Sequence, residues 1–163
     1  MRQESPESGS IARVMAESVA RRAVDGDLEA LWPLIQAFYE IDHHDFERDR
    51  IERAIRPLLV DDTYGQVWVL DRAGEVEGYA VVTWSWSVES GGRDCILDEI
   101  YVAFRARGRG SKLLSAVFDG ARAAGASAVF LETEAHNVRG RSFYQRHGFD
   151  VEGCVWMSRS LLG

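Results

Sequence analysis

Hydrophobic residues in the first third of the chain follow two different spacings. Apolar and polar residues alternate over residues 18–24, which predicts a first β-strand. The sequence Asp25-Gly-Asp27 then supplies a turn and a helix cap. Apolar residues at three- and four-residue spacings follow and predict two amphipathic helices. The first contains Leu28, Leu31, Leu34, Ile35 and Phe38, and the second, stopping around residues 57–62, contains Ile51, Ala54, Ile55 and Leu58.

From Gln66 onwards the spacing becomes that of β-strands. Glycine-containing turns separate three apolar runs, at residues 67–70, 78–86 and 95–102, which predicts an antiparallel meander. The pattern then predicts a helix around 113–121, a short strand at 128–133, a helix at 138–146 and a last strand at 151–161. The fold class is therefore α/β, with a mixed, mostly antiparallel central sheet flanked by helices.

Length and composition fit a single domain. The chain has 163 residues, of which 46% are hydrophobic, and this is enough apolar material for one core. Residues 1–17 are polar and lack periodicity, so we expect a flexible leader before a domain at 18–163. The apolar runs are far shorter than the roughly 20 residues that span a bilayer. We therefore expect a cytoplasmic protein with no membrane partner.

The charge balance narrows the class of partner. A formal net charge of −7 disfavours nucleic acid, because such binding needs Lys and Arg side chains to neutralise phosphates. A small cationic partner would match the charge better. Cys95 and Cys154 lack CxxC spacing, and His43 and His44 are adjacent rather than four residues apart, so no metal site is predicted.

A glycine- and arginine-rich segment lies between the predicted strand 95–102 and the helix that follows it. Glycines allow the backbone to approach a ligand closely, and the free N–H groups of a first helical turn favour phosphate. A Walker loop is excluded by the order Gly110-Ser-Lys112, and a dinucleotide fingerprint by Leu113 in the place of its third glycine. A solvated turn is the alternative interpretation.

This segment resembles the pyrophosphate loop of the GCN5-related N-acetyltransferase (GNAT) superfamily, through Arg105-x-x-Gly108-x-Gly110. Residues 137–149 are similar to a second signature of that superfamily, with Gly140 in the place of the usual alanine. Residues 91–102 are similar to the strand before the loop in a general bacterial subgroup of unassigned substrate. The resemblance covers residues 18–161 and implies the GNAT fold.

The resemblance also implies a cofactor, acetyl-CoA, and residues that bind it. The strand residues Ile100, Tyr101 and Val102 would pair with the pantetheine arm. The pyrophosphate would lie on Arg105, Arg107, Gly108, Arg109, Gly110 and Ser111, although Arg107 can also be aligned with the first arginine of the motif. Asn137 would contact the cofactor or cap a helix. Tyr144 matches the tyrosine that protonates the departing thiolate, or it packs in the core.

A primary amine also needs a proton acceptor, since at neutral pH only about one molecule in 10³ is unprotonated. Asp98 and Glu99 are the candidates, directly or through water. Adjacent strand residues point to opposite faces, so we expect only one of them to face the reaction. The alternative is that either carboxylate caps a loop or pairs with Arg93.

We therefore expect an N-acetyltransferase that acts on a primary amine of a small molecule or peptide by direct attack. A non-catalytic acyl-CoA sensor with the same fold is the alternative, and a homodimer is possible. The resemblance also indicates regions that shape the acceptor pocket, where the same side chains are equally suited to the core. These regions contain Tyr39, Glu40, His43, His44, Phe46, Trp84 and Trp86.

Overall fold

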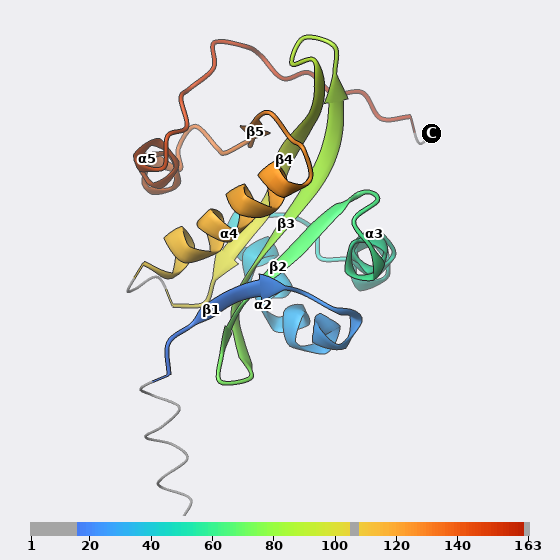
Figure 1. Cartoon of the computed structure of the whole chain (residues 1–163), viewed down its shortest axis with the longest axis vertical. Helices are drawn as coiled ribbons and strands as arrows, with labels where there is room; N and C mark the ends of the chain where they lie inside the picture. The colour runs from blue at the N-terminus through green and yellow to red at the C-terminus, as the bar shows by residue number, and fades with distance from the viewer. Residues whose placement is uncertain (1–15, 105–107, 162–163) are drawn as a thin grey trace, which may run out of the picture. The chain divides into compact units, whose positions relative to one another are not determined.

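A five-stranded sheet organises the computed structural model, which describes residues 16–104 and 108–161 (Figure 1). The strand order is β1-β2-β3-β4-β5; β1 to β4 pair antiparallel, and β5 runs parallel to β4. The predicted mixed, mostly antiparallel α/β sheet is confirmed. The strands are β1 Val19–Arg22, β2 Gly65–Arg72, β3 Glu75–Ser87, β4 Gly92–Val102 and β5 Val129–Phe130.

The helices follow the predicted amphipathic patterns. They are η1 Asp25–Asp27, α2 Leu28–Asp42, α3 Arg48–Val60, α4 Arg109–Ala123 and α5 Val138–Arg146. The chain divides into two compact units, Met1–Glu132 and Thr133–Gly163, and α5 belongs to the second. Within the described residues, no helix combines the length and apolar character needed to cross a membrane.

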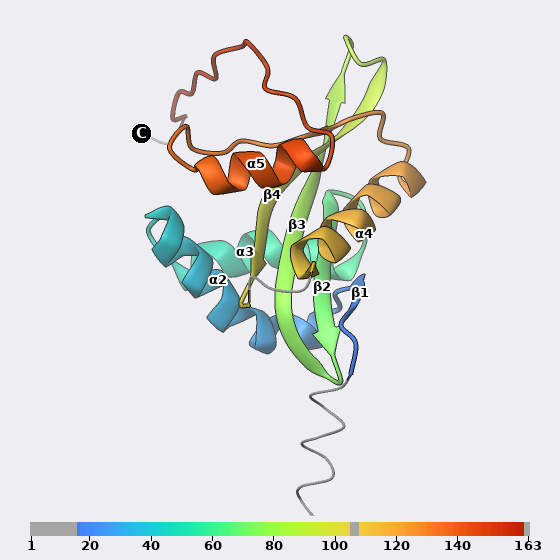
Figure 2. The same cartoon turned by 90° about the vertical axis from the view of Figure 1, so that its left-hand side faces the viewer.

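The sheet of the first unit is covered on both faces. Figure 2 shows α2 and α3 on one side of the strands and α4 on the other. Val67 and Val69 of β2 belong to the core formed with α2 and α3. Trp68 faces α4 instead, because a Cβ atom added at Gly120 would lie 2.5 Å from its ring. Successive side chains of a β-strand point to opposite faces of the sheet, as they do along β2. The absence of a side chain at Gly120 lets α4 pack closely against Trp68.

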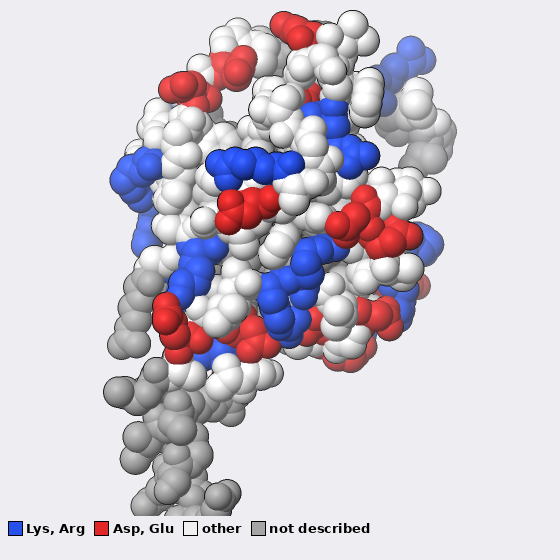
Figure 3. Space-filling model, in the orientation of Figure 1, with Lys and Arg blue, Asp and Glu red and all other residues white. Residues whose placement is uncertain are grey.

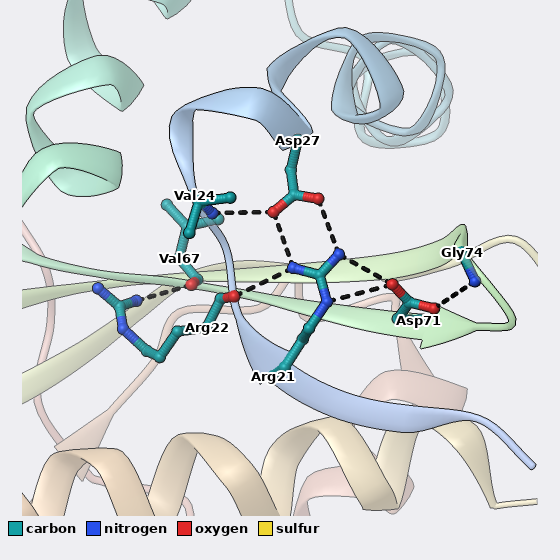
Figure 4. Close-up of polar contacts among 7 residues, drawn as sticks. All are labelled: Arg21, Arg22, Val24, Asp27, Val67, Asp71 and Gly74. Carbon is teal, nitrogen blue, oxygen red and sulfur yellow. Dashed lines mark hydrogen bonds and ion pairs between the residues drawn. The ribbon is translucent and has the colours of Figure 1, made fainter.

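Arg21 joins β1, η1 and β2 (Figure 4). Its guanidinium donates to both oxygens of Asp27, each at 2.8 Å, and to Asp71 Oδ2 at 2.8 and 3.1 Å. Asp27 also accepts from the Val24 N–H at 2.8 Å, and its pKa is lowered, chiefly by the hydrogen bond from Arg21. Planar, bidentate pairing of this kind fixes direction as well as distance. The first strand is thereby held in register against the β2–β3 hairpin.

Two predictions about the last strands need correction. The predicted strand at 128–133 is reduced to Val129–Phe130, and residues 151–161 contain no strand. Described residues of the second unit form α5 and no other regular element. A strand is stable only when a neighbouring strand satisfies its backbone groups, so loose alternation at 151–161 was insufficient evidence.

Candidate active site

A cavity of about 410 Å³ opens on the face of the sheet that α2 and α3 cover. Four carboxylates and one guanidinium line it, so negative charge dominates inside. The lining residues are Phe38, Tyr39 and Asp42 of α2, His44 and Asp45 of the following loop, Arg50 of α3, and Asp98 and Glu99 of β4. Four of these lining residues, Tyr39, His44, Asp98 and Glu99, are also candidates from the sequence.

A β-bulge explains why two consecutive β4 residues reach the same cavity. Glu99 pairs with Val81 and Leu97 pairs with Val82, so Asp98 is an extra residue opposite the Val81–Val82 step. A bulge interrupts the alternation of side chains and re-aims those next to it. Both carboxylates therefore line one cavity, and the expectation that strand alternation would separate them is wrong.

Glu99 is held by tyrosine hydroxyls. Tyr79, whose side chain is fully buried, donates from its hydroxyl to Glu99 Oε2 at 2.7 Å, and Tyr39 adds a second hydrogen-bonding interaction. Burial raises the pKa of Glu99, while the two tyrosines act in the opposite direction and Asp98 adds to the rise. The pKa of Tyr39 is raised to about 12 by burial and by Glu99. These tyrosines remain donors at neutral pH and orient the carboxylate.

Asp98 lies at the solvent side of the same wall. Asp98 is an exposed residue, yet partial burial of its carboxyl group raises its pKa. Arg93 is engaged elsewhere: it donates to the Ala124 carbonyl at 2.9 Å and lies over the Trp84 ring at 5.6 Å. The alternative that Arg93 pairs with one of these carboxylates is therefore not what the structure shows.

The edge of β4 beyond the bulge is open. β5 pairs with β4 only at Cys95↔Val129 and Ile96↔Phe130, and the two strands then part. Ile100, Tyr101 and Val102 pair with β3 on one side, and no described strand pairs with them on the other. An exposed strand edge presents backbone N–H and C=O groups that can pair with an extended amide-containing ligand.

The first turn of α4 follows this strand after the segment 103–108. Gly108 caps the helix in the left-handed region (φ 70°, ψ 14°), and Arg109, Gly110 and Ser111 form the turn. The N–H groups of a first turn lack intrahelical acceptors and carry partial positive charge, which suits an anion. Arg105 and Arg107 lie outside the described residues, so the structure says nothing of their predicted phosphate contacts.

The side chain of Arg109 is directed to a buried carboxylate. Its Nε lies 3.3 Å from Glu77 Oε2, and its guanidinium lies over the Phe104 ring at 5.7 Å. Glu77 also pairs with Arg72 and accepts from the Ser18 hydroxyl at 3.0 Å. Arg109 thus anchors the first turn of α4 by its side chain, which leaves its backbone N–H as the candidate phosphate donor. Nothing in the sequence pattern marked Glu77 for this role.

The second unit contains the other two predicted site residues. Asn137 caps α5: its Oδ1 accepts from the Gly140 N–H at 2.9 Å, and its Nδ2 donates to Thr133 Oγ1 at 3.1 Å. A Cβ at Gly140 would lie only 2.4 Å from Asn137 Nδ2, so glycine suits this cap. Tyr144 lies in α5, with its ring 5.7 Å from that of Phe149. Cofactor contact by Asn137 and acid catalysis by Tyr144 stay predictions.

Three other residues expected at the acceptor pocket are absent from the lining of this cavity. Glu40 accepts from Gln36 at 3.1 Å, Phe46 packs edge-on against Trp32, and the Trp84 indole donates to the Asp62 carbonyl at 2.8 Å. Sequence reasoning missed Arg50, which lines the cavity, and Tyr79, which donates to Glu99, because both places depend on pairing between distant segments. Across residues 16–104 and 108–161, no three His, Cys, Asp or Glu side chains are arranged to hold a metal ion.

The order of elements, a β4 edge followed by the N-terminus of α4, is the one that the sequence resemblance implied for the fold. The sequence model of the acetyltransferase (GNAT) family matches residues 28–149, well over half of the chain. The chain belongs to the GNAT acetyltransferase family. It is therefore an acetyl-CoA-dependent acyltransferase with the GNAT fold, as predicted.

One curated relative and two solved structures illustrate what the chain is similar to. YhfO of Bacillus subtilis (strain 168), an uncharacterized N-acetyltransferase, is 30% identical over 134 residues, covering 81% of this chain and 89% of the relative. An integron cassette protein from the mobile metagenome of Cole Harbour Salt Marsh superposes with a TM-score of 0.77 at 29% identity, covering 88% of this chain and 91% of its own. Aminoglycoside N-acetyltransferase AAC(6')-Iy, solved in complex with CoA, superposes with a TM-score of 0.75 at 18% identity. The match covers 90% of this chain and 96% of that chain, and at this identity it shows the fold alone.

Proposed function

We propose that this GNAT protein transfers the acetyl group of acetyl-CoA directly to a primary amine of a small, cationic molecule or a peptide. The observation that carries the proposal is the acidic cavity on β4. Its carboxylates Asp98 and Glu99 lie on the same strand as the open edge, directly before Ile100. An ammonium group would be attracted to these carboxylates.

The residues present fit acetyl-CoA. Ile100, Tyr101 and Val102 offer an unpaired strand edge for the amides of its pantetheine arm, and the N–H groups from Arg109 to Ser111 suit its pyrophosphate. A solved structure of the same fold contains CoA, which supports the assignment. When bound, acetyl-CoA supplies the thioester carbonyl that an amine can attack.

The side chains of the cavity would prepare the amine. A primary ammonium has a pKa near 10.4, so it arrives protonated and must lose a proton before it can react. Asp98 and Glu99, which the sequence predicts as proton acceptors directly or through water, would hold the cation by charge-assisted hydrogen bonds. Tyr144 is the proposed acid.

The distribution of charge supports a small cationic acceptor over a nucleic acid. On the face drawn in Figure 3, basic and acidic side chains are interspersed rather than gathered by sign. The net charge of −7 adds no attraction for phosphates. Inside the cavity, by contrast, four carboxylates face one arginine. We therefore propose that the acceptor is selected by its positive charge.

Thermal unfolding with acetyl-CoA tests the cofactor. Binding to the folded state stabilises by about 2.7 kcal/mol when the ligand is at 100 times its Kd, so the midpoint should rise by several degrees. Gly110→Glu places a negative charge in the first turn of α4 and should abolish the rise. Glutamate is favourable at a helix N-terminus, so the unliganded variant should unfold near the wild-type temperature.

The wild-type protein, supplied with acetyl-CoA and a panel of primary amines, should release free CoA in the same amount as it forms acetylated amine. No rise in midpoint for the wild type would contradict the cofactor assignment. A rise without any CoA release would instead favour the non-catalytic acyl-CoA sensor.

Tyr144→Phe tests the proposed acid. If the phenol protonates the departing thiolate, kcat should fall about 100-fold or more while the midpoint shift with acetyl-CoA is retained. Phenylalanine preserves the ring that packs against Phe149, so folding should be little affected. Phe143→Leu, which alters the neighbouring ring, serves as the packing control. An unchanged kcat for Tyr144→Phe would leave Tyr144 with a packing role only.

A further inference from the structure

The end of α2 brings His44 to the cavity. His43 adopts the left-handed conformation (φ 57°, ψ 34°) that ends the helix, and the His44 N–H then donates to the Tyr39 carbonyl at 3.0 Å. This reversal places the His44 ring beside the Tyr39 ring, with centroids 6.1 Å apart, and on the cavity wall. Of two adjacent histidines, only the second lines the cavity.

Asp42 holds one nitrogen of this ring. His44 Nε2 lies 2.9 Å from Asp42 Oδ2. A carboxylate only accepts hydrogen bonds, so the neutral imidazole carries its proton on Nε2 and presents a lone pair on Nδ1. The pairing also stabilises the cation formed when Nδ1 takes a proton. A histidine oriented in this way is suited to general base catalysis.

The charged groups that line the cavity with His44 are mainly carboxylates. Tyr39 and Asp42 face it from α2, Asp45 from the loop, and Asp98 and Glu99 from β4. Arg50 of α3 is the one guanidinium on the cavity wall, and it donates to the Asp45 carbonyl at 2.9 Å. His44 is also close enough to Glu99 to lower the pKa of that carboxyl. Net negative surroundings attract a cationic acceptor to this part of the cavity.

We propose that His44, oriented by Asp42, accepts the proton of the acceptor ammonium in place of Asp98 and Glu99, which hold its charge. The proposal rests on the proposed acetyl transfer. An N–H bond of the ammonium breaks, its electron pair stays on the amine nitrogen, and the lone pair of Nδ1 forms the new N–H bond. The imidazolium then releases this proton to water, to which 62% of the His44 side chain is exposed.

Relative basicity supports this division of tasks. An ordinary imidazole is a stronger base than an ordinary carboxylate by about 2 pKa units, which means about 100-fold in equilibrium proton affinity. Glu99 already accepts from Tyr79 and Tyr39, and these hydrogen bonds orient its oxygens to hold a cation. His44 has Asp42 as its orienting partner and lies at the exit to solvent.

The test compares His44→Gln with His43→Asn. Glutamine keeps polarity and size without a titrating nitrogen, whereas asparagine at residue 43 tolerates the left-handed conformation and leaves His44 in place. With the best amine of the panel, His44→Gln should lower kcat/KM by about 100-fold or more at neutral pH. It should also remove the rising limb of kcat/KM that imidazole titration produces between about pH 5 and 8. His43→Asn should change neither.

Two further measurements separate the possible failures. Asp42→Asn can donate its amide N–H to Nε2 and so favour the opposite tautomer, which should lower kcat/KM while acetyl-CoA still raises the unfolding midpoint. Independently of activity, ¹⁵N NMR of the His44 ring, assigned with the His44→Gln spectrum, should show the neutral Nε2–H form.

A His44→Gln variant with kcat/KM within twofold of wild type, or with the same pH limb, would overturn the role of His44 while acetyl transfer stands. The same conclusion would follow from an Nδ1–H tautomer. A wild-type protein that neither responds to acetyl-CoA nor releases CoA would overturn the proposed function, and the role of His44 with it.

Discussion

Converting both β4 carboxylates to amides, as Asp98→Asn with Glu99→Gln, is expected to lower kcat/KM for a cationic amine by about 100-fold or more, because each charge-assisted hydrogen bond contributes about 1.5–3 kcal/mol. The two side chains share one cavity through the bulge in β4. The loss should appear mainly as a raised KM, since holding the charge is their proposed task. Steady-state kinetics at two ionic strengths measures these changes in KM and kcat/KM.

Glu40→Gln is the matched control for these variants. Glu40 is an exposed carboxylate of α2 that accepts a hydrogen bond from Gln36, and it does not line the cavity. Glu40→Gln removes one carboxylate charge outside the cavity and is compared with each single variant, Asp98→Asn and Glu99→Gln, so a small effect would show that position in the cavity matters rather than net charge. Equal losses in the control and the double variant would contradict the assignment of Asp98 and Glu99.

The same amide variants should not lower stability at neutral pH. Burial raises the carboxyl pKa values of Asp98 and Glu99, so the folded chain holds these protons more tightly than the unfolded chain. The stability that these two carboxyl groups contribute when protonated is therefore lost as the pH rises through their raised pKa values. Above those values both groups are ionised in the folded chain, and their burial then lowers the free energy of unfolding. Amides remove this cost. A lower unfolding midpoint for Glu99→Gln would instead mean that the hydrogen bond from the Tyr79 hydroxyl to the Glu99 carboxylate stabilises the fold by more than ionisation of Glu99 costs.

The fold was largely predictable because its elements have strong local patterns. Residues 28–42 form α2 with its apolar stripe buried, and the runs that became β2 to β4 alternate between two covered faces. Residues 151–161 alternate too weakly to specify a strand, and whether such a segment pairs depends on a neighbour that the sequence does not name. Local spacing therefore predicts a segment's tendency, and tertiary pairing decides the outcome.

The site was predicted less completely for a related reason. Asp98, Glu99 and the glycine segment were found through short motifs, whereas the bulge that unites the two carboxylates arises from the register of β3 against β4. Tyr79 resembles any buried strand residue until its hydroxyl is seen 2.7 Å from Glu99, twenty positions away. The His44 pairing depends on the turn that ends α2. Partners brought together by folding leave no local signal.

Glu77→Gln is expected to destabilise the fold by about 3–5 kcal/mol, the usual cost of breaking a buried ion pair by removing one partner. For a domain of this size that corresponds to a fall of roughly 6–20 °C in the unfolding midpoint. Glu77 is 3% exposed and pairs with Arg72 and Arg109. Glu89→Gln, which removes an exposed carboxylate from the hairpin after β3, should change the midpoint little and serves as the control.

The expected loss follows from what Glu77 leaves behind. A neutral amide can still accept from Ser18, but it cannot balance two guanidinium groups whose side chains are only 20% and 11% exposed. Ser18→Ala removes only a hydroxyl and should cost about 1 kcal/mol. Because Arg109 opens α4, Glu77→Gln should also weaken acetyl-CoA binding, measured as a smaller midpoint shift relative to its own unliganded state. Since buried charges are poorly screened, added salt should not restore stability, and recovery at high salt would contradict this account.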